Sequence, residues 1–412
     1  MSHHETSHHG TPLRGTRHRI VVLGAGYAGS YAAGYLARRL HRDDVEITVV
    51  NAAPDFVERM RLHQFAAGHD LDRRPLADVF AGTGIDLRIA EVTGIDADNR
   101  TVTIDGQDQL GYDSLVYTLG STAAHHAVPG AAEHAFHVAT APAAGRLRAR
   151  LGEIDGGRVV VVGGNLTAIE AATEIAESRP GLTVALATTG ELGGWLGARA
   201  RRHVLAAFDR LGIDVHEHAT VTGVDASSVT AMGGTVLASD ATVWAAGFAV
   251  HPIAAAGGLD VTPEGQIVVD RQLRSVSHPD VYAAGDSAHV VGDNGLTLPM
   301  SCATAGLSSR QLAATVLGDR TGRRIPATPK FYVGSHVSLG RRDAVFQLVD
   351  KQAQSRPVSL RGRAAARFKA SVLTGAAWST THPTSGLPSR RHRLAASSSP
   401  AESAPAPATT SA

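Results

Sequence analysis

The chain has one cysteine, Cys302, among its 412 residues. A single cysteine can form neither an intramolecular disulfide nor a Cys–Cys redox pair. Chemistry that depends on a pair of thiols within one chain is therefore excluded. We favour the interpretation that Cys302 is a small, buried, apolar residue over a redox role for its thiol.

Long apolar runs and an excess of charge of one sign are missing as well. No run reaches the ~18 residues that a membrane-spanning helix needs, and residues 1–5 lack the apolar core of a signal peptide. The 39 Lys and Arg nearly balance the 38 Asp and Glu, so nothing attracts nucleic acid in general. With 19% charged and 43% apolar residues, the composition is that of a globular chain. We expect a cytoplasmic protein of two or three domains.

The clearest motif is a glycine turn between an apolar strand and a helical pattern. Residues 18–23 form the strand, Gly24-x-Gly26-x-x-Gly29 follows, and the helix is expected to run to about Leu40. Gly24 allows the tight turn, Gly26 lets a phosphate approach the backbone, and Gly29 lets helix and strand pack closely. The helix N-terminus then faces the phosphate. The motif predicts a dinucleotide site in an α/β fold.

The strand after this helix, residues 46–50, ends at Asn51. An acid commonly holds the ribose hydroxyls at this position. Asparagine can still accept and donate hydrogen bonds, so Asn51 remains a candidate ribose ligand. It lacks the charge that would repel a 2′-phosphate.

A second, altered turn follows another apolar strand and reads Gly163-x-Asn165-x-x-Ala168. Alanine is permitted at the third position. Asparagine at the second tolerates a left-handed backbone but is expected to crowd a diphosphate. The next strand ends in Thr188, with no acid that would exclude a 2′-phosphate and no evident Arg that would bind one. The pattern fits either a second dinucleotide site or a nucleotide fold that has lost its ligand.

Two further strand ends belong to the same pattern. The strand at residues 281–284 ends in Gly285-Asp286. Asp286 is well placed to accept hydrogen bonds from a polyol, while the next helix points its N-terminus at the ligand. The strands that end in Gly120 and Gly247 look alike, each running into small residues. This is consistent with two nucleotide-binding units, the second inserted into the first.

Together these motifs resemble the flavoproteins of the pyridine nucleotide–disulfide oxidoreductase-like family, and within it the type II NADH dehydrogenases (NADH:quinone reductases). The resemblance covers roughly residues 18–378. It implies an α/β fold with two Rossmann-like, three-layer domains, FAD on the first turn and NADH or NADPH on the second. Hydride would pass from NAD(P)H to the flavin and electrons onward to an acceptor, with a quinone favoured.

The resemblance also implies ligands. The ribityl chain is implied for Asp286, the adenine for the backbone of Val92, and the pyrimidine end of the flavin for the helix around Ala303. The implied FAD ligands are Gly24, Gly26, Tyr27, Ala28, Gly29, Asn51, Val92, Gly120, Gly285, Asp286 and Ala303. The implied NAD(P) ligands are Gly163, Asn165, Ala168, Glu170 and Gly247.

No side chain is a certain acid or base for such a reaction, and no metal is expected. Glu170 is either a capping or surface carboxylate or a polar group near the nicotinamide. His63 and Gln64 lie in a segment, residues 56–64, that is expected to be helical. They could face the acceptor, although a lone histidine is more often structural.

The expected division of the chain follows from these assignments. Its parts are a His-rich leader at 1–17, FAD-domain parts at 18–155 and 248–325, an NAD(P) domain at 156–247, a C-terminal region at 326–380 and a disordered tail at 381–412. A flexible leader is favoured over metal binding by His3, His4, His8 and His9.

The C-terminal region is the basis for guessing the acceptor. Residues 320–370 contain twelve Lys or Arg against two Asp. Residues 361–378 carry Phe368, Val372 and Leu373 at helical spacing beside basic residues. This suits a helix on the inner face of an anionic membrane, where a lipid quinone would be met. The same helix could instead pack on the flavin domain with its basic face in solvent.

Other functions stay open from the sequence. The family's Cys pair is missing, its ribose acid is Asn51, and its second turn is altered. The chain could therefore be a flavin-binding sensor or interaction protein whose nicotinamide site has decayed, or a reductase of a soluble carrier such as ferredoxin. A homodimer is open too.

Overall fold

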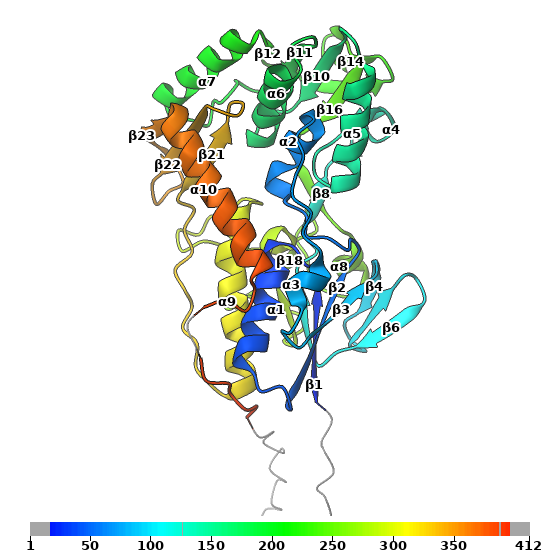
Figure 1. Ribbon diagram of the computed structural model, residues 1–412, viewed down its shortest axis with the longest axis vertical. Coiled ribbons are helices and arrows are strands. Elements are labelled where there is room, and N and C mark those ends of the chain that lie inside the picture. The colour runs from blue at the N-terminus through cyan, green and yellow to red at the C-terminus, as the bar shows by residue number, and fades with distance from the viewer. Residues whose placement is uncertain (1–16, 126, 387–388, 396–412) are drawn as a thin grey trace, which may run out of the picture.

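The computed structural model describes residues 17–125, 127–386 and 389–395, so nearly all of the predicted leader lies outside the described residues. Two parallel sheets occupy the two ends of an elongated molecule, and a third, C-terminal layer runs along one side of both (Figure 1). Within the described ranges, no helix combines the length and hydropathy needed to cross a bilayer.

The lower sheet has five parallel strands in the order β19-β7-β1-β2-β3. Its strands are β1 (His18–Leu23), β2 (Val45–Asn51), β3 (Ile85–Ile89), β7 (Ser114–Tyr117) and β19 (Val281–Ala283). Helices α1 (Tyr27–Arg39) and α9 (Cys302–Thr321) lie side by side against it. The central strands are apolar and buried along their length, as expected for a parallel sheet covered on both faces.

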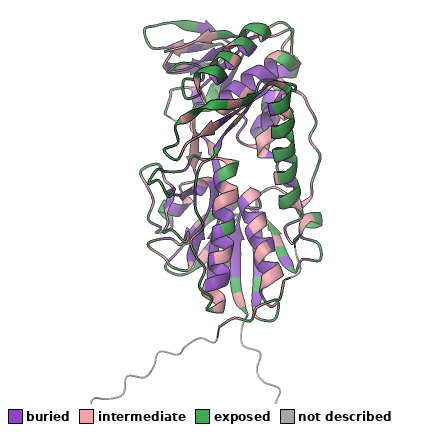
Figure 2. Ribbon diagram, turned by 90° about the vertical axis from the view of Figure 1, so that its left-hand side faces the viewer, coloured by how far each residue is buried: buried purple, intermediate pink, exposed green. Residues whose placement is uncertain are grey.

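The upper sheet repeats this plan in the order β12-β11-β10-β16-β9, again all parallel. Its strands are β9 (Ala135–Phe136), β10 (Arg158–Val162), β11 (Thr183–Ala187), β12 (Asp214–His216) and β16 (Ala241–Trp244). Helices α5 (Ala141–Glu153), α6 (Leu166–Ser178) and α7 (Ala198–Leu211) flank it. Figure 2 shows buried strands at the centre and helices with exposed outer sides.

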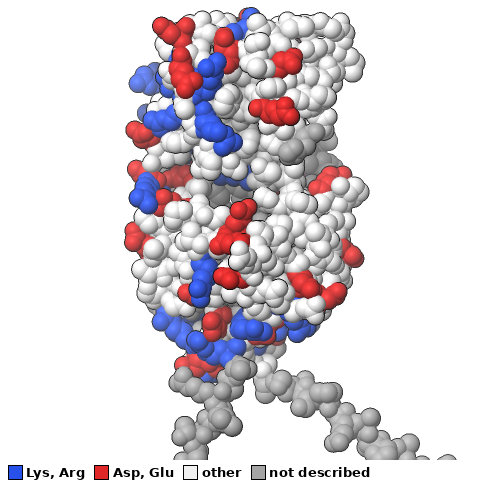
Figure 3. Space-filling view, turned by 90° about the vertical axis from the view of Figure 1, so that its right-hand side faces the viewer, with Lys and Arg blue, Asp and Glu red and all other residues white. Residues whose placement is uncertain are grey.

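Two short antiparallel strands join the halves. The chain leaves the lower sheet through β8 (Ser121–Ala123) and returns through β17 (Phe248–Val250), which pairs with β8. The second nucleotide-binding unit is thus inserted into the first, and the predicted fold class is confirmed. The face shown in Figure 3 is hollowed between the halves, with charges of both signs spread over it.

Smaller elements complete the two units. Two three-stranded antiparallel sheets are formed by β4 (Val92–Asp96), β5 (Thr101–Ile104) and β6 (Asp108–Gly111), and by β13 (Val221–Asp225), β14 (Ser228–Ala231) and β15 (Val236–Ala238). The remaining short elements are η1 (Arg59–Arg61), α2 (Leu62–Ala67), α3 (Leu76–Phe80), α4 (Ala131–His134), α8 (Ile253–Ala256), β18 (Ile267–Val268), η2 (Gly285–Ser287) and β20 (Ala288–His289).

The C-terminal layer consists of a three-stranded sheet and one long helix. The strands are β21 (Gly334–Ser338), β22 (Ala344–Val349) and β23 (Ser355–Arg361), followed by α10 (Gly362–Thr381). Helix α10 packs on this sheet and on α1 of the lower half, and its Lys369 contacts Glu170 in α6 of the upper half.

Two predicted boundaries were wrong: the start of the helix at residue 56 and the start of the disordered tail at residue 381. Residues 56–58 are not helical, because the backbone N–H of Phe56 pairs with Arg74 and the first helical turn, η1, starts at Arg59. The tail predicted to be disordered from residue 381 is partly docked. Arg393 pairs with Asp44 at 2.6 Å, and the Leu394 side chain packs against the lower core. Composition could not reveal this contact, because its partner is far away in the sequence.

Candidate active site

The first glycine turn has the geometry that a dinucleotide needs. Gly24 has φ +90°, and a Cβ there would lie 2.6 Å from the carbonyl oxygen of Thr118. A Cβ on Gly29 would lie only 1.8 Å from the carbonyl oxygen of Gly24. Gly26 differs, because beyond its chain neighbours and its own helix backbone a Cβ there would meet no atom of the described residues within 4 Å. Packing alone therefore explains Gly24 and Gly29, whereas the space at Gly26 fits an approaching phosphate.

Asn51, at the end of β2, lies next to this turn and hydrogen-bonds to it. Its Oδ1 accepts a hydrogen bond from the N–H of Ala25 at 2.8 Å, and its Nδ2 donates to the carbonyl of Ala53 at 2.7 Å. A second hydrogen on Nδ2 and a second lone pair on Oδ1 are left for a ribose hydroxyl. A ribose role for Asn51 stays a prediction.

Asp286 stands beside the same turn and carries two contacts on one carboxylate oxygen. Its Oδ2 accepts from Ser121 Oγ at 2.7 Å and pairs with Arg59 Nη1 at 3.4 Å. Gly285 has φ +74° and donates its N–H to Ser308 on α9. Among the described residues no hydrogen-bond donor reaches Oδ1, which could accept a hydrogen bond from a polyol hydroxyl. Neither Arg59 nor Ser121 could be predicted from the sequence, since no motif marks either residue.

The N-terminus of α9 opens into the same region. Ser301 caps the helix by accepting the N–H of Thr304 at 3.2 Å, and Ala303 is exposed in the first turn. Cys302 is exposed too, so its assignment as a buried apolar residue was wrong. Cys302 and Ala303 are exposed while Thr304 in the same turn is buried, a difference that periodicity could not show. Val92, the implied adenine contact, begins β4 and is buried.

The second turn keeps its shape despite the substitutions. Gly163 has φ +139° and no room for a side chain, because a Cβ would lie 2.6 Å from the carbonyl of Ala245. Asn165 caps α6, since its Oδ1 accepts the N–H of Ala168 at 3.1 Å. Its Nδ2 donates to Ala245 at 2.8 Å. The Asn165 amide thus hydrogen-bonds to the turn and to Ala245, the residue after β16, instead of pointing toward the place of a bound diphosphate.

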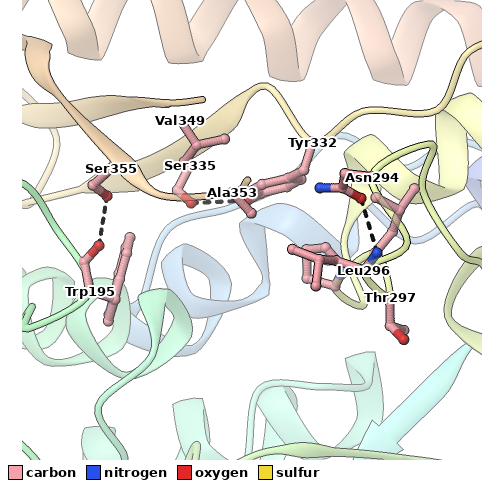
Figure 4. A pocket seen from close by; sticks show the side chains of 11 residues that line it. Trp195, Asn294, Leu296, Thr297, Tyr332, Ser335, Val349, Ala353 and Ser355 are labelled. Carbon is pink, nitrogen blue, oxygen red and sulfur yellow. Dashed lines mark hydrogen bonds between the residues drawn. The ribbon is translucent and has the colours of Figure 1, made fainter. Parts of the chain in front are cut away.

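A pocket lies next to the second turn (Figure 4). Trp195 borders it and donates its Nε1–H to the carbonyl of Gly164 at 3.3 Å. On the opposite side, the loop that contains Leu296 and Pro299 leads to the N-terminus of α9. The pocket therefore lies between Trp195, which contacts the second turn, and the loop that precedes α9. Its lining is Trp195, Asn294, Leu296, Thr297, Leu298, Pro299, Tyr332, Ser335, Val349, Ala353 and Ser355.

Of the three catalytic candidates, the structure brings Glu170 and His63 together. Glu170 is neither a cap nor a surface group: it pairs with Lys369 of α10 and accepts the N–H of Ser338 at 3.0 Å. Burial penalises the charge of Glu170, but Lys369 and the neighbouring donors prevail and lower its pKa. His63 Nδ1 lies 4.0 Å from Glu170, and burial lowers the pKa of His63 to about 4, so its ring is neutral. Gln64 is half-buried.

One helical turn further along α6, Glu174 is fully buried. Burial raises its pKa to about 7, which Arg341 opposes only in part. Its Oε1 lies 3.0 Å from His69 Nε2, but burial lowers the pKa of His69 as well. Both shifts favour neutral groups, so this contact joins a protonated acid to a neutral imidazole. The carboxylates of Glu170 and Glu177 add to the cost of ionising Glu174.

This pKa makes the stability of the protein depend on pH. The folded protein keeps a proton on Glu174 up to about pH 7, whereas the unfolded chain loses it near the ordinary value of 4.5. Stability is therefore lost as pH rises from about 4.5 to 7. We expect Glu174→Gln to raise the free energy of unfolding at pH 8 by about 1–3 kcal/mol and to have little effect at pH 4. Urea unfolding at both pH values measures this. The matched variant Glu264→Gln, at an exposed position away from Glu174, should show no such gain. An equal effect of Glu174→Gln at both pH values would contradict the assignment.

No group of three His, Cys, Asp or Glu that could hold a metal occurs in the described part of the chain. The implied ligands of the first turn surround space that a phosphate can enter, and they leave an oxygen of Asp286 for a polyol. They fit FAD. Whether the individual residues bind it stays a prediction.

Comparison with known proteins places this site in a family. A NADH dehydrogenase-like protein of Mycobacterium tuberculosis (Rv1812c) is 31% identical over 382 residues, covering 86% of this chain and 93% of the relative. The type II NADH:quinone oxidoreductase NdhA of the same organism is 27% identical, with 81% and 79% covered.

Solved structures share the fold. The sulfide:quinone oxidoreductase of Aquifex aeolicus has a TM-score of 0.75 at 20% identity, covering 89% of this chain and 92% of that one. A ferredoxin reductase of Rhodopseudomonas palustris has a TM-score of 0.67 at 24% identity, with 80% and 82% covered.

The family itself is established by the match of residues 18–308 to pyridine nucleotide-disulphide oxidoreductases. The chain is thus a flavoprotein oxidoreductase that uses FAD and NAD(P)H. It belongs to the pyridine nucleotide-disulphide oxidoreductase family, in a branch without the cysteine pair.

Proposed function

We propose that this protein is an NAD(P)H:quinone reductase that meets a lipid quinone at a membrane surface. FAD supplies the hydride and electron chemistry when bound. The turn at Gly24–Gly29 and the N-terminus of α1 would hold its diphosphate, and Asp286 its ribityl chain. The N-terminus of α9 would favour negative charge on the reduced flavin.

The pyridine nucleotide would lie between the second turn and the loop before α9. Three features support this placement. Gly163 and Asn165 shape a capped helix N-terminus at the carboxyl end of a parallel sheet. The pocket is lined by both Trp195, whose indole donates to Gly164 of that turn, and Pro299. Gly247 lies in the link between the halves, where its carbonyl accepts the N–H of Ala124.

The observation that carries the quinone proposal is the two-sided character of α10. Its outer side exposes Phe368, Val372 and Trp378, and residues 370–381 contain no charged side chain. Its inner side presents Lys369, which pairs with Glu170 beside the second turn. One helix thus joins an apolar surface to the interior of the site.

The first two turns of α10 complete a membrane-facing surface. Arg363 in the first turn and Arg367 in the second are exposed, and the Phe368 ring lies 5.1 Å from that of Phe346. Basic residues beside exposed aromatics suit an anionic lipid surface. The packing of α10 on β22 and α1 is compatible with this role, because Phe368 stays 40% exposed even though its ring contacts Phe346. A relative that is named an NADH:quinone oxidoreductase adds support.

Anaerobic spectroscopy tests the function. The purified protein should be yellow and should bleach when NADH or NADPH is added. Reduced protein should then be reoxidised by menadione, a water-soluble quinone analogue, and not by ferredoxin. A flavin that stays oxidised with both nucleotides would support the decayed-site alternative. Reoxidation by ferredoxin alone would replace the quinone by a soluble carrier.

The membrane contact is tested in the same assay with long-chain menaquinone in anionic phosphatidylglycerol vesicles. The double variant Phe368→Ser/Trp378→Ser should lower the vesicle rate at least about fivefold and leave the menadione rate unchanged, because it removes buried apolar area at the lipid. The matched control is Met232→Ser/Val236→Ser, which removes exposed apolar side chains from the β14–β15 hairpin. Equal vesicle rates for the two double variants would contradict the membrane role of α10.

A further inference from the structure

Arg59 occupies a place next to Asp286 that no motif assigns. It begins the η1 turn between β2 and α2, and its side chain is 28% exposed. Its Nη2 donates to Ser121 Oγ at 2.9 Å, its Nη1 lies 3.4 Å from Asp286 Oδ2, and its Cζ lies 5.1 Å from the centre of the Phe248 ring. A largely covered cation therefore stands beside the proposed ribityl ligand.

The pairing of Arg59 with Asp286 is a loose one. Charge-assisted hydrogen bonds are normally about 2.7–2.9 Å long, and Arg274 reaches Asp319 at 2.6 and 2.8 Å in the same half of the molecule. Ser121 makes the closer contact with Asp286, at 2.7 Å. Burial lowers the pKa of Arg59, which shows that its surroundings do not fully compensate the charge. The guanidinium thus has capacity for a further anionic or carbonyl partner.

The neighbours of Arg59 place it along the expected course of FAD. The diphosphate end belongs at Gly26 and the ribityl chain at Asp286. Ser121 and Phe248 belong to β8 and β17, the strands that lead to the second nucleotide-binding unit. Arg59 reaches from Asp286 toward these strands, which is the direction in which the flavin ring must extend to meet a nicotinamide held by the upper sheet.

We propose that Arg59 is a cationic ligand of the isoalloxazine end of FAD, oriented by Asp286 and Ser121, and that it binds the anionic reduced flavin more tightly than the oxidised flavin. A cation in a partly dehydrated site interacts more strongly with an anion than with a neutral ring. Arg59 therefore raises the two-electron midpoint potential of the flavin. The proposal rests on the FAD site and is independent of the electron acceptor.

The test compares Arg59→Met, Arg59→Lys and Arg61→Met. Arg61 lies on the same turn, but its partner is Glu58 at 3.3 Å, away from Asp286. The potential is measured by dithionite titration of the FAD-loaded protein against a reference dye, which requires neither NAD(P)H nor quinone. Binding of oxidised FAD to the apoprotein is measured by quenching of free FAD fluorescence.

We expect Arg59→Met to weaken binding of reduced FAD about tenfold more than binding of oxidised FAD, which lowers the potential by about 30 mV. Arg59→Lys keeps a cation and should restore most of the difference. Arg61→Met should match the wild type. If Arg59→Met retains the wild-type potential, the proposal is wrong, even if FAD affinity falls. If Arg59→Met cannot be loaded with FAD, Arg59→Lys is the deciding variant. A potential close to the wild type would support the proposal, and a drop of about 30 mV or more would contradict it, because lysine keeps the positive charge.

Discussion

Alanine at position 26 is expected to weaken FAD binding at least about tenfold, or about 1.4 kcal/mol, without lowering the thermal stability of the apoprotein. Gly26 has φ −75°, which alanine adopts freely. Apart from its chain neighbours and its own helix backbone, no atom of the described residues lies within 4 Å of the added Cβ. The cost therefore falls on the ligand, because the methyl group stands where a diphosphate must approach the backbone. Equilibrium binding of FAD and the melting temperature of the apoprotein measure the two effects separately.

The matched control is Gly29→Ala, three positions along the sequence, where the added methyl group would clash with the protein rather than with the ligand. Its Cβ would lie 1.8 Å from the carbonyl oxygen of Gly24 and 2.6 Å from Thr118 Oγ1. This variant should lose fold stability and FAD together, since α1 can no longer pack on the turn. Wild-type FAD affinity in Gly26→Ala would show that the diphosphate does not lie on this turn.

Replacing Lys369 by methionine is expected to lower the free energy of unfolding by about 3–5 kcal/mol, the usual cost of leaving one member of a buried ion pair without its partner. Lys369 is buried on the inner side of α10 and pairs with Glu170. Without it, the carboxylate keeps only the N–H of Ser338 as a close donor among the described contacts. The nearby His63 gives little help, because burial keeps its imidazole neutral. Urea unfolding at pH 7 measures the loss.

The double variant Glu170→Gln/Lys369→Met should regain most of this stability, because no uncompensated charge is left. Lys351→Met is the matched control, since Lys351 is an exposed lysine of the same C-terminal layer. A loss below 1 kcal/mol in Lys369→Met would mean that the pair is not closed in solution. Closure of this pair attaches α10 to α6, so the variant should also loosen the C-terminal layer.

Local features of the site could be predicted from the sequence. The glycine turns depend on backbone conformations and close packing that few residues other than glycine satisfy, and this leaves a recognisable spacing around Gly24 and Gly163. The strands are apolar along their length because parallel sheets are covered on both faces. The insertion of one nucleotide-binding unit into the other was predicted from the similar strand ends at Gly120 and Gly247, and it is confirmed.

Features that depend on distant partners could not be predicted. The burial of Glu170 depends on Lys369, 199 positions away. The place of Arg59 depends on Asp286, 227 positions away. Cys302 was assigned to the core because cysteine is often buried, but exposure depends on what covers the first turn of α9. Pairing across such separations leaves no local spacing to detect.

By itself, the sequence determined the class of fold, the two glycine turns and the absence of a thiol pair, because each follows from the conformational or chemical limits of single residue types. Only the tertiary structure decided that the Asn165 side chain caps α6 and binds Ala245 instead of facing a ligand. The same holds for the contacts of Arg59 and Ser121 with Asp286, and for the position of α10 between an exposed apolar surface and Glu170. These contacts depend on packing between elements, and packing depends on the whole chain at once.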